Sequence, residues 1–187
     1  MNKLALAVMI STLGMAAGTA QARPSMEPID PTGMVHFHGK VLTNSCKITG
    51  EGKNLNVTLP VVMDRQVHSG QTTGDTRFEI NVKDCPAYGH YAPKLAWDVP
   101  RVDVNKNGDL TNDGRGGAQN VALRLIDNHN NNVNLKDSTK RYKASYVSHD
   151  GERRTYSFKV GYIKGDERGP VKPGSVKAHA KYSITYQ

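Results

Sequence analysis

The chain has 187 residues, of which 37% are hydrophobic and 22% are charged, and its formal net charge at pH 7 is +8. This length can bury the hydrophobic core of one domain. Because the basic residues are scattered, with no basic helix and no basic stripe carrying aromatic residues, the composition argues against a nucleic-acid partner and for an ordinary solvated surface.

The first 22 residues have the features of a secretory signal peptide. Lys3 gives a short basic start, an apolar run follows, and Ala20-Gln21-Ala22 supplies the small-residue cleavage pattern. Gly14 and Gly18 interrupt the run too early for a membrane-spanning helix. We therefore expect residues 1–22 to be removed on export, with an uncleaved anchor as the alternative.

The next segment begins as a proline-rich tail and ends as a predicted strand. Residues 23–33 contain three prolines and no periodicity. In GMVHFHGKV, residues 33–41, one face carries Val35, Phe37, Gly39 and Val41, and the other carries His36, His38 and Lys40. This period of two is typical of a strand with one buried face. His36 and His38 could hold a metal ion, although a solvent-facing pair is the simpler interpretation.

The two cysteines of the chain are Cys46 and Cys85. In the oxidising compartment that export implies, the simplest prediction is one intramolecular disulfide between them. A metal site is the competing use, but zinc sites usually pair cysteines a few residues apart, and neither cysteine has such a neighbour.

Several later stretches alternate apolar and polar residues, with Gly, Asn, Asp and Pro between them. Their apolar positions are Phe78, Ile80 and Val82; Val121, Leu123 and Leu125; Tyr156, Phe158, Val160 and Tyr162; and, in the longest stretch, Val176, Ala178, Ala180, Tyr182, Ile184 and Tyr186. The polar run NHNNNVN, residues 128–134, is predicted to turn a hairpin because Asn tolerates left-handed conformations. Together these short strands predict an antiparallel β-sandwich.

Two motifs suggest chemistry, and neither completes a site. DVNKNGDLTNDG, residues 103–114, matches the early positions of a calcium loop but has Gly114 where the bidentate Glu belongs. Ser148-His149-Asp150 has the residue types of a hydrolase triad, but sequence neighbours cannot adopt the triad geometry. Tyr182 and Tyr186 are interpreted as packing residues. The sequence therefore predicts no enzyme, no metal and no cofactor.

Four blocks, in order, resemble the chaperone–usher fimbrial subunits of the type 1-like major pilin family. GMVHFHGKVLTNSCKI is similar to the start of a mature pilin, and NVTLPVVMDRQVHSGQTTGDTRFEINVKDC to the next block, where a V-x-L-P strand, a Gly and T-x-F-x-I lead to the second cysteine. NGDLTND and AQNVALRLIDNHNNNVNL resemble the middle block, and PGSVKAHAKYSITYQ resembles the last block with its penultimate Tyr.

The resemblance implies an incomplete immunoglobulin-like β-sandwich, which a strand from a neighbouring subunit completes. Residues 23–43 are then the tail and donor-strand extension, and residues 44–187 are the pilin domain. Val35, Phe37 and Val41 are the expected donor side chains, with Gly39 where the acceptor has no room for a side chain. The expected acceptor groove and chaperone contacts are Val176, Ala178, Ala180, Tyr182, Ile184, Tyr186 and Gln187. An alternative is that residues 35–41 pair within their own subunit.

The expected partners follow from the same resemblance: a periplasmic pilus chaperone, an outer-membrane usher, identical or related pilins, and a host-surface receptor. The expected location is a fimbria on the bacterial cell surface, reached through the periplasm, with a role in cell adhesion. The alternative functions are a minor or tip adhesive subunit and a secreted glycan-binding β-sandwich. Residues 146–172 form a longer connection than the resemblance leads us to expect, and are predicted to be a surface feature of their own.

Overall fold

The computed structural model describes residues 34–37, 45–86, 92–114 and 116–186. The chain divides into two units, Met1–Gly39 and Lys40–Gln187, and every described strand belongs to the second unit. These strands are β1 (Lys47–Ile48), β2 (Thr73–Lys83), β3 (Pro93–Asp98), β4 (Leu110–Thr111), β5 (Val121–Asp127), β6 (Tyr146–Val147), β7 (Arg154–Lys164) and β8 (Lys181–Tyr186). Within the described ranges, three short 3₁₀ turns connect them, η1 (Gly50–Asn54), η2 (Asp64–Gln66) and η4 (Arg101–Asp103).

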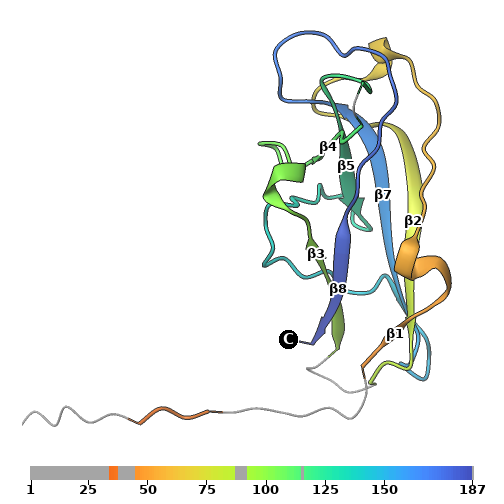
Figure 1. The fold of residues 1–187 in the computed structure, drawn as a ribbon. Helices are drawn as coiled ribbons and strands as arrows, with labels where there is room; N and C mark the ends of the chain where they lie inside the picture. Colours follow the sequence, from red (N-terminus) through yellow and green to blue (C-terminus); the bar gives the residue numbers. More distant parts are fainter. Residues whose placement is uncertain (1–33, 38–44, 87–91, 115, 187) are drawn as a thin grey trace, which may run out of the picture. The chain divides into compact units, whose positions relative to one another are not determined.

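The larger sheet is antiparallel and has β7 at its centre (Figure 1). Its order is β1-β2-β7-β5-β4, and β6 also pairs with β7. Along β7, β2 occupies one edge, while β5 and β6 share the other edge end to end. Because β7 is paired on both sides, its core-facing side chains Tyr156, Phe158 and Val160 are buried at every second position.

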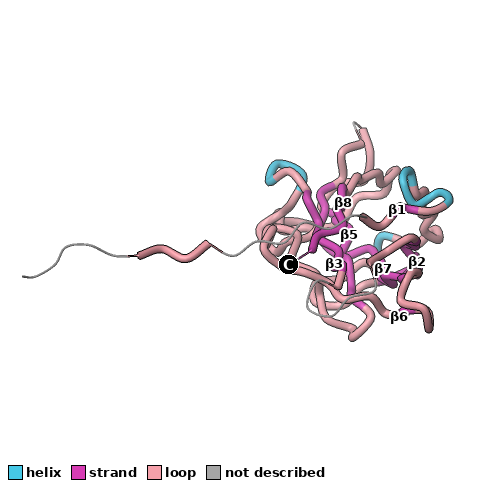
Figure 2. Tube along the Cα trace, turned by 90° about the horizontal axis from the view of Figure 1, so that it is seen from below, coloured by secondary structure: helices cyan, strands magenta, loops and turns pink. Residues whose placement is uncertain are grey.

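The smaller sheet consists of β3 and β8, which run antiparallel, with Trp97 opposite Tyr182 and Leu95 opposite Ile184. On its other edge, β3 exchanges two backbone hydrogen bonds with Tyr142, through the N–H and C=O of Leu95. Figure 2 views the chain from below and shows strands and loops with only short helical turns. No helix in the described part of the chain is long and apolar enough to cross a membrane.

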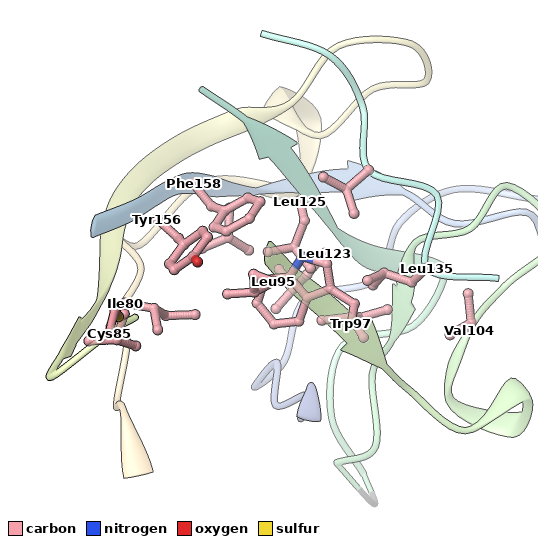
Figure 3. Packing of buried hydrophobic residues seen from close by; sticks show 14 residues of the cluster. Ile80, Cys85, Leu95, Trp97, Val104, Leu123, Leu125, Leu135, Tyr156 and Phe158 are labelled. Atoms are coloured by element: carbon pink, nitrogen blue, oxygen red, sulfur yellow. The ribbon is translucent and has the colours of Figure 1, made fainter. Parts of the chain in front are cut away.

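The core lies between the two sheets and is rich in aromatic rings (Figure 3). The ring of Trp97 meets that of Phe158 edge-on with centroids 5.2 Å apart, and Phe158 stacks on Phe78 at 5.9 Å. The hydroxyl of Tyr156 donates a 2.8 Å hydrogen bond to the carbonyl of Pro93, which ties β7 to β3 across the core. Such centroid distances are those at which aromatic pairs stabilise each other beyond simple burial.

The prediction of an all-β sandwich is confirmed, as are the strands that contain Phe78, Val121 and Tyr156. The hairpin at residues 128–134 is confirmed too. The carboxylate of Asp127 accepts hydrogen bonds from the backbone N–H groups of His129 and Asn131. Asn130 takes a left-handed conformation, with φ of 63°, which closes the turn as the Asn-rich sequence indicates.

Three expectations about strands are wrong. The last strand begins at Lys181 and not at Val176, because residues 176–180 have no neighbouring strand with which to form a ladder. The V-x-L-P stretch, residues 57–60, lies outside the strands for the same reason. Residues 146–172 are not a separate surface feature, since they contain β6 and the central strand β7. β3 was not predicted, because its side chains are buried on both faces and do not alternate.

Candidate functional site: an open apolar groove

An open groove of about 530 Å³ runs between two extended segments of the domain. We call it the acceptor groove. One wall is the segment 54–59, the other is the segment 176–182, and the floor is built from core side chains of both sheets. Floor residues include Phe78, Ile80, Trp97, Leu110, Leu123, Leu125 and Val160. The hydrophobic core is therefore open along this groove.

The first wall alternates half-buried apolar residues with exposed polar ones. Leu55, Val57 and Leu59 are half-buried and line the groove, while Asn56 and Thr58 are exposed. Among the described residues, none makes a backbone hydrogen bond to residues 55–59. A segment with strand-like alternation but no ladder is a sheet edge that still lacks a neighbour.

The second wall shows the same alternation, with Val176, Ala178 and Ala180 half-buried and Lys177 and His179 exposed between them. Its outer side is anchored to the loop that follows β4. Lys177 receives a 2.9 Å hydrogen bond at its carbonyl from the N–H of Asp113 and donates one of 2.9 Å to the side-chain oxygen of Asn112. Successive residues of an extended chain direct their backbone groups to opposite edges, so those of Val176 and Ala178 face the groove.

Tyr182 closes the groove where β8 begins. Its ring meets Trp97 edge-on at 6.0 Å, and its hydroxyl donates a hydrogen bond to the carbonyl of Gly52 in the η1 turn, which leads into the first wall. Burial raises the pKa of the Tyr182 phenol above its ordinary value, so it stays a neutral donor. It therefore links the two walls at this end of the groove.

The disulfide predicted from the sequence joins Cys46 to Cys85, 39 residues apart. It attaches the residue just before β1 to the segment just after β2. The backbone N–H of Cys46 also donates a 2.5 Å hydrogen bond to the hydroxyl of Tyr186. Both contacts hold the N-terminal end of the domain against β2 and β8.

The predicted acceptor residues are partly brought together by the structure. Val176, Ala178, Ala180 and Tyr182 line the groove, whereas Ile184 packs on the core and Tyr186 meets Cys46. Gln187 lies outside the described residues. The alternation in the sequence did not reveal that Leu55, Val57 and Leu59 form the opposite wall, although the V-x-L-P stretch contained two of them.

The predicted donor residues are described only in part. Val35 is 74% exposed and Phe37 is 91% exposed, and residues 34–37 form no strand. Gly39, Val41 and His38 lie outside the described residues. An exposed phenylalanine in an alternating stretch is an apolar side chain that no described part of the chain covers.

The two motifs that suggested chemistry have structural roles. In the loop at residues 103–114, the buried carboxylate of Asp109 binds the guanidinium of Arg124 through two contacts of 2.6 and 2.9 Å. Ser148 lies in the turn between β6 and β7, where its hydroxyl donates a 2.5 Å hydrogen bond to Asp150. Within the described residues, no group of three His, Cys, Asp or Glu side chains could hold a metal ion.

Known proteins are similar to this chain in both sequence and fold. The F17 fimbrial protein of Escherichia coli is 28% identical, over 91% of this chain and 96% of its own length. The A chain of the Escherichia coli type-1 fimbrial protein is 25% identical over 96% of each chain.

Among solved structures, the P pilus rod subunit PapA matches with a TM-score of 0.57 at 19% identity, over 82% of this chain and 100% of that one. A Burkholderia pseudomallei antigen and type I fimbria protein matches with a TM-score of 0.53 at 25% identity, over 76% of this chain and 90% of that one. The fold is the incomplete immunoglobulin-like β-sandwich of pilin subunits. The sequence model of the fimbrial protein family matches residues 35–187, and the chain belongs to that family.

Proposed function

We propose that the chain is a structural subunit of a surface fimbria, not an enzyme, and that it polymerises by strand donation. The observation that carries this proposal is the acceptor groove. Within its two walls, residues 55–59 and 176–180 have strand-like alternation, half-buried apolar side chains and backbone groups that face the groove without a strand partner among the described residues. One added strand would pair with those backbone groups and cover the core.

The extension at residues 33–43 has the chemistry of that added strand. Its alternation offers Val35, Phe37 and Val41 on one face, which suits the apolar floor of the groove. At strand rise, residues 35–43 span ~30 Å, enough to run along the edge of a sandwich. Gly39 would leave one position of the donor without a side chain, which suits a point where the groove has no room for one. The extension of one subunit would thus fill the groove of the next.

A free subunit with an open groove is prone to aggregate, because its core is partly uncovered and its strand edges are unpaired. We propose that a periplasmic chaperone first covers the groove, with Tyr186 and the terminal carboxylate of Gln187 among its contacts. An outer-membrane usher would then exchange the chaperone for the next subunit's extension. The signal-like residues 1–22 would direct export into the periplasm, and the fibre would stand on the cell surface and support adhesion.

Refolding of a chain that lacks residues 23–43 tests strand donation directly. A synthetic peptide of residues 30–43 should raise the midpoint of the cooperative thermal transition, measured by circular dichroism, well above that of the truncated chain alone. A Phe37→Asp peptide should fail, since it places a charge against an apolar floor. A His36→Asp peptide makes the same change on the opposite face and should work. The same transition with and without peptide would show that the sandwich is already complete.

A further inference from the structure

The domain carries exposed apolar side chains at two places. Val61 is 97% exposed and Met63 is 54% exposed in the loop after the first wall, and we call these two residues the tip patch. Tyr146 and Val147 of β6 are 61% and 42% exposed, and we call them the base patch. Among the described residues of the domain, Val102 is the one other large apolar side chain with comparable exposure.

The register of the larger sheet places the two patches at opposite ends of β2. Pro60 and Val62, which alternate with the tip patch, pack over Gly74 near the start of β2, where an added Cβ atom would lie 3.1 Å from each of them. Val147 lies level with Val82 near the end of β2, because both pair with the same residue of β7. From Gly74 to Val82 the strand spans ~27 Å at ordinary strand rise.

The loop that carries the tip patch has a fixed conformation. The backbone N–H of Met63 donates a 2.8 Å hydrogen bond to the side-chain oxygen of Gln66, and the N–H of Gln66 donates one of 2.9 Å to the carbonyl of Met63. Pro60 and Val62 occupy the side of the loop that faces β2. Because the loop cannot turn Val61 and Met63 inward, they stay in water unless another surface covers them.

The tip patch directly continues the first wall of the acceptor groove, whose lining ends at Leu59. At the other end of the groove, Tyr182 joins the two walls through its hydrogen bond to Gly52. Between Leu59 and Val176, no hydrogen bond joins the walls among the described residues. A donor strand whose chain continues into a folded domain therefore leaves the groove at this unbridged end, beside the tip patch.

Only a short piece of chain connects the donor strand to its own domain. Residues 42–45 separate Val41 from Cys46, so the Cα atoms of those two residues lie at most ~18 Å apart. Cys46 stands just before β1, whose Ile48 pairs with Val82 at the level of the base patch. The base end of each subunit must therefore come close to the tip patch of the subunit that accepts its strand.

We propose that the tip patch of each subunit packs against the base patch of the next subunit along the fibre, an inference that rests on the proposed strand donation. The occupant is a second copy of this chain, because the donor strand itself delivers the base end of that copy, and the exposed side chains there are apolar too. Two different patches that meet form a heterologous interface, which repeats along a filament without closing. The contact takes both patches out of water and limits bending between consecutive domains.

The stiffness of fibres assembled from the full chain tests this contact. Val61→Asp puts a charge on the tip patch but leaves the lining of the acceptor groove unchanged, so fibres should still form. Their persistence length, measured by electron microscopy, should fall at least about threefold, because the carboxylate stays in water and keeps the domains apart. The control Val102→Asp changes a valine that is 86% exposed on η4, on the other side of the sandwich from β2 (Figure 1), and should preserve stiffness. Wild-type stiffness in Val61→Asp fibres would overturn the proposal.

Chemical cross-linking shows directly which surfaces meet, and it remains decisive if Val61→Asp does not assemble. The double variant Val61→Lys/Val147→Asp places an amine on each tip patch and a carboxylate on each base patch. A carbodiimide condenses neighbouring amines and carboxylates to amides and takes up the water released. Because the two residues lie at opposite ends of one subunit, an amide between residues 61 and 147 can only join two subunits. Mass spectrometry of digested fibres should find this link, which neither single variant can form, and its absence would overturn the proposal.

Failure of this contact and failure of strand donation give different results. If the wild-type chain forms no fibres, strand donation is wrong and the tip-to-base contact falls with it. If the wild type and the double variant form fibres but residues 61 and 147 are not linked, strand donation stands and only the tip-to-base contact is overturned. Fibres that form, soften with Val61→Asp and give the link would establish the contact.

Discussion

The central strand β7 and the segment 176–180 carry the same alternation of apolar and polar residues, but in different surroundings. Tyr156, Phe158 and Val160 of β7 are 1%, 3% and 6% exposed, whereas the apolar residues of segment 176–180 are only half-buried. β7 has strands on both edges. On its groove side, segment 176–180 has no strand partner among the described residues.

Alternation therefore determines which side chains share a face, whereas neighbouring strands determine how far that face is buried. Each half-buried apolar side chain of the open groove forgoes part of the stabilisation that complete burial would give, which is ~1.5–3 kcal/mol for a large aliphatic residue. The same sequence pattern thus occurs in two parts of one sandwich. We call the part around β7 the closed half and the part along the two walls of the acceptor groove, residues 54–59 and 176–182, the open half. The open half is where a further strand would stabilise the fold most.

The largest effect is expected from a charge placed in the open half. Val57→Asp puts a carboxylate on the wall of the acceptor groove, where a donor strand would have to bury it without a partner. We expect complete loss of fibre formation, measured by electron microscopy and by the ladder of multimers that resist detergent.

The matched control is Thr58→Asp, at the adjacent position. Thr58 is exposed and is not part of the groove lining, so the same carboxylate would face water. Fibres should form as in the wild type. If Val57→Asp also gives normal fibres, the groove is not the acceptor.

Removal of the disulfide should show how far the stability of the domain depends on the covalent link between the two ends of the loop that contains the first wall. Cys46–Cys85 closes a loop that contains the whole first wall, with a sequence separation of 39 residues. The double variant Cys46→Ser/Cys85→Ser should lose about 4 kcal/mol of unfolding free energy, from loop-closure entropy. Urea denaturation of the peptide-completed domain measures this loss. A loss below about 1 kcal/mol would show that the wall is held by its other contacts.

The sequence predicted the closed half better than the open half, for a physical reason. Alternation identified β2, β5 and β7 because each has one core-facing side. It missed β3, in which Leu95, Ala96 and Trp97 are all buried, since a strand covered on both faces has no period of two.

Alternation also predicted a strand as far back as Val176, although the ladder begins only at Lys181. Periodicity is a property of one segment, whereas a ladder needs a second segment. The sequence gives no sign of whether that second segment lies in the same chain.

A matched pair of valine truncations should measure the difference in burial between the two halves. Val82 is 2% exposed in β2, and Val82→Ala should cost about 2 kcal/mol through lost contacts and a cavity. Val176 is half-buried beside the groove, and Val176→Ala should cost less than about 1 kcal/mol in the subunit without a donor. With the donor peptide bound, the cost at Val176 should rise toward that at Val82. Equal costs with and without peptide would contradict an open groove.

The smallest effect concerns Tyr156, whose hydroxyl joins the two sheets within the closed half. Burial raises the pKa of Tyr156 to about 12, from an ordinary value of 10.0. The folded state therefore favours the neutral phenol, and this contribution is fully present below pH 10 and is lost as the pH rises toward 12. Tyr156→Phe should cost about 1 kcal/mol at pH 7 by removing the hydrogen bond to Pro93.

Between pH 10 and 12 the Tyr156→Phe variant should lose less stability than the wild type, as urea denaturation at each pH can measure. Part of the alkaline loss should persist, because burial also raises the pKa of Tyr142 to about 12. Tyr146→Phe removes a phenol that is exposed and should match the wild type throughout. A Tyr156→Phe profile parallel to that of the wild type would mean that the phenol is not buried, and the closed half would then be less closed than β7 indicates.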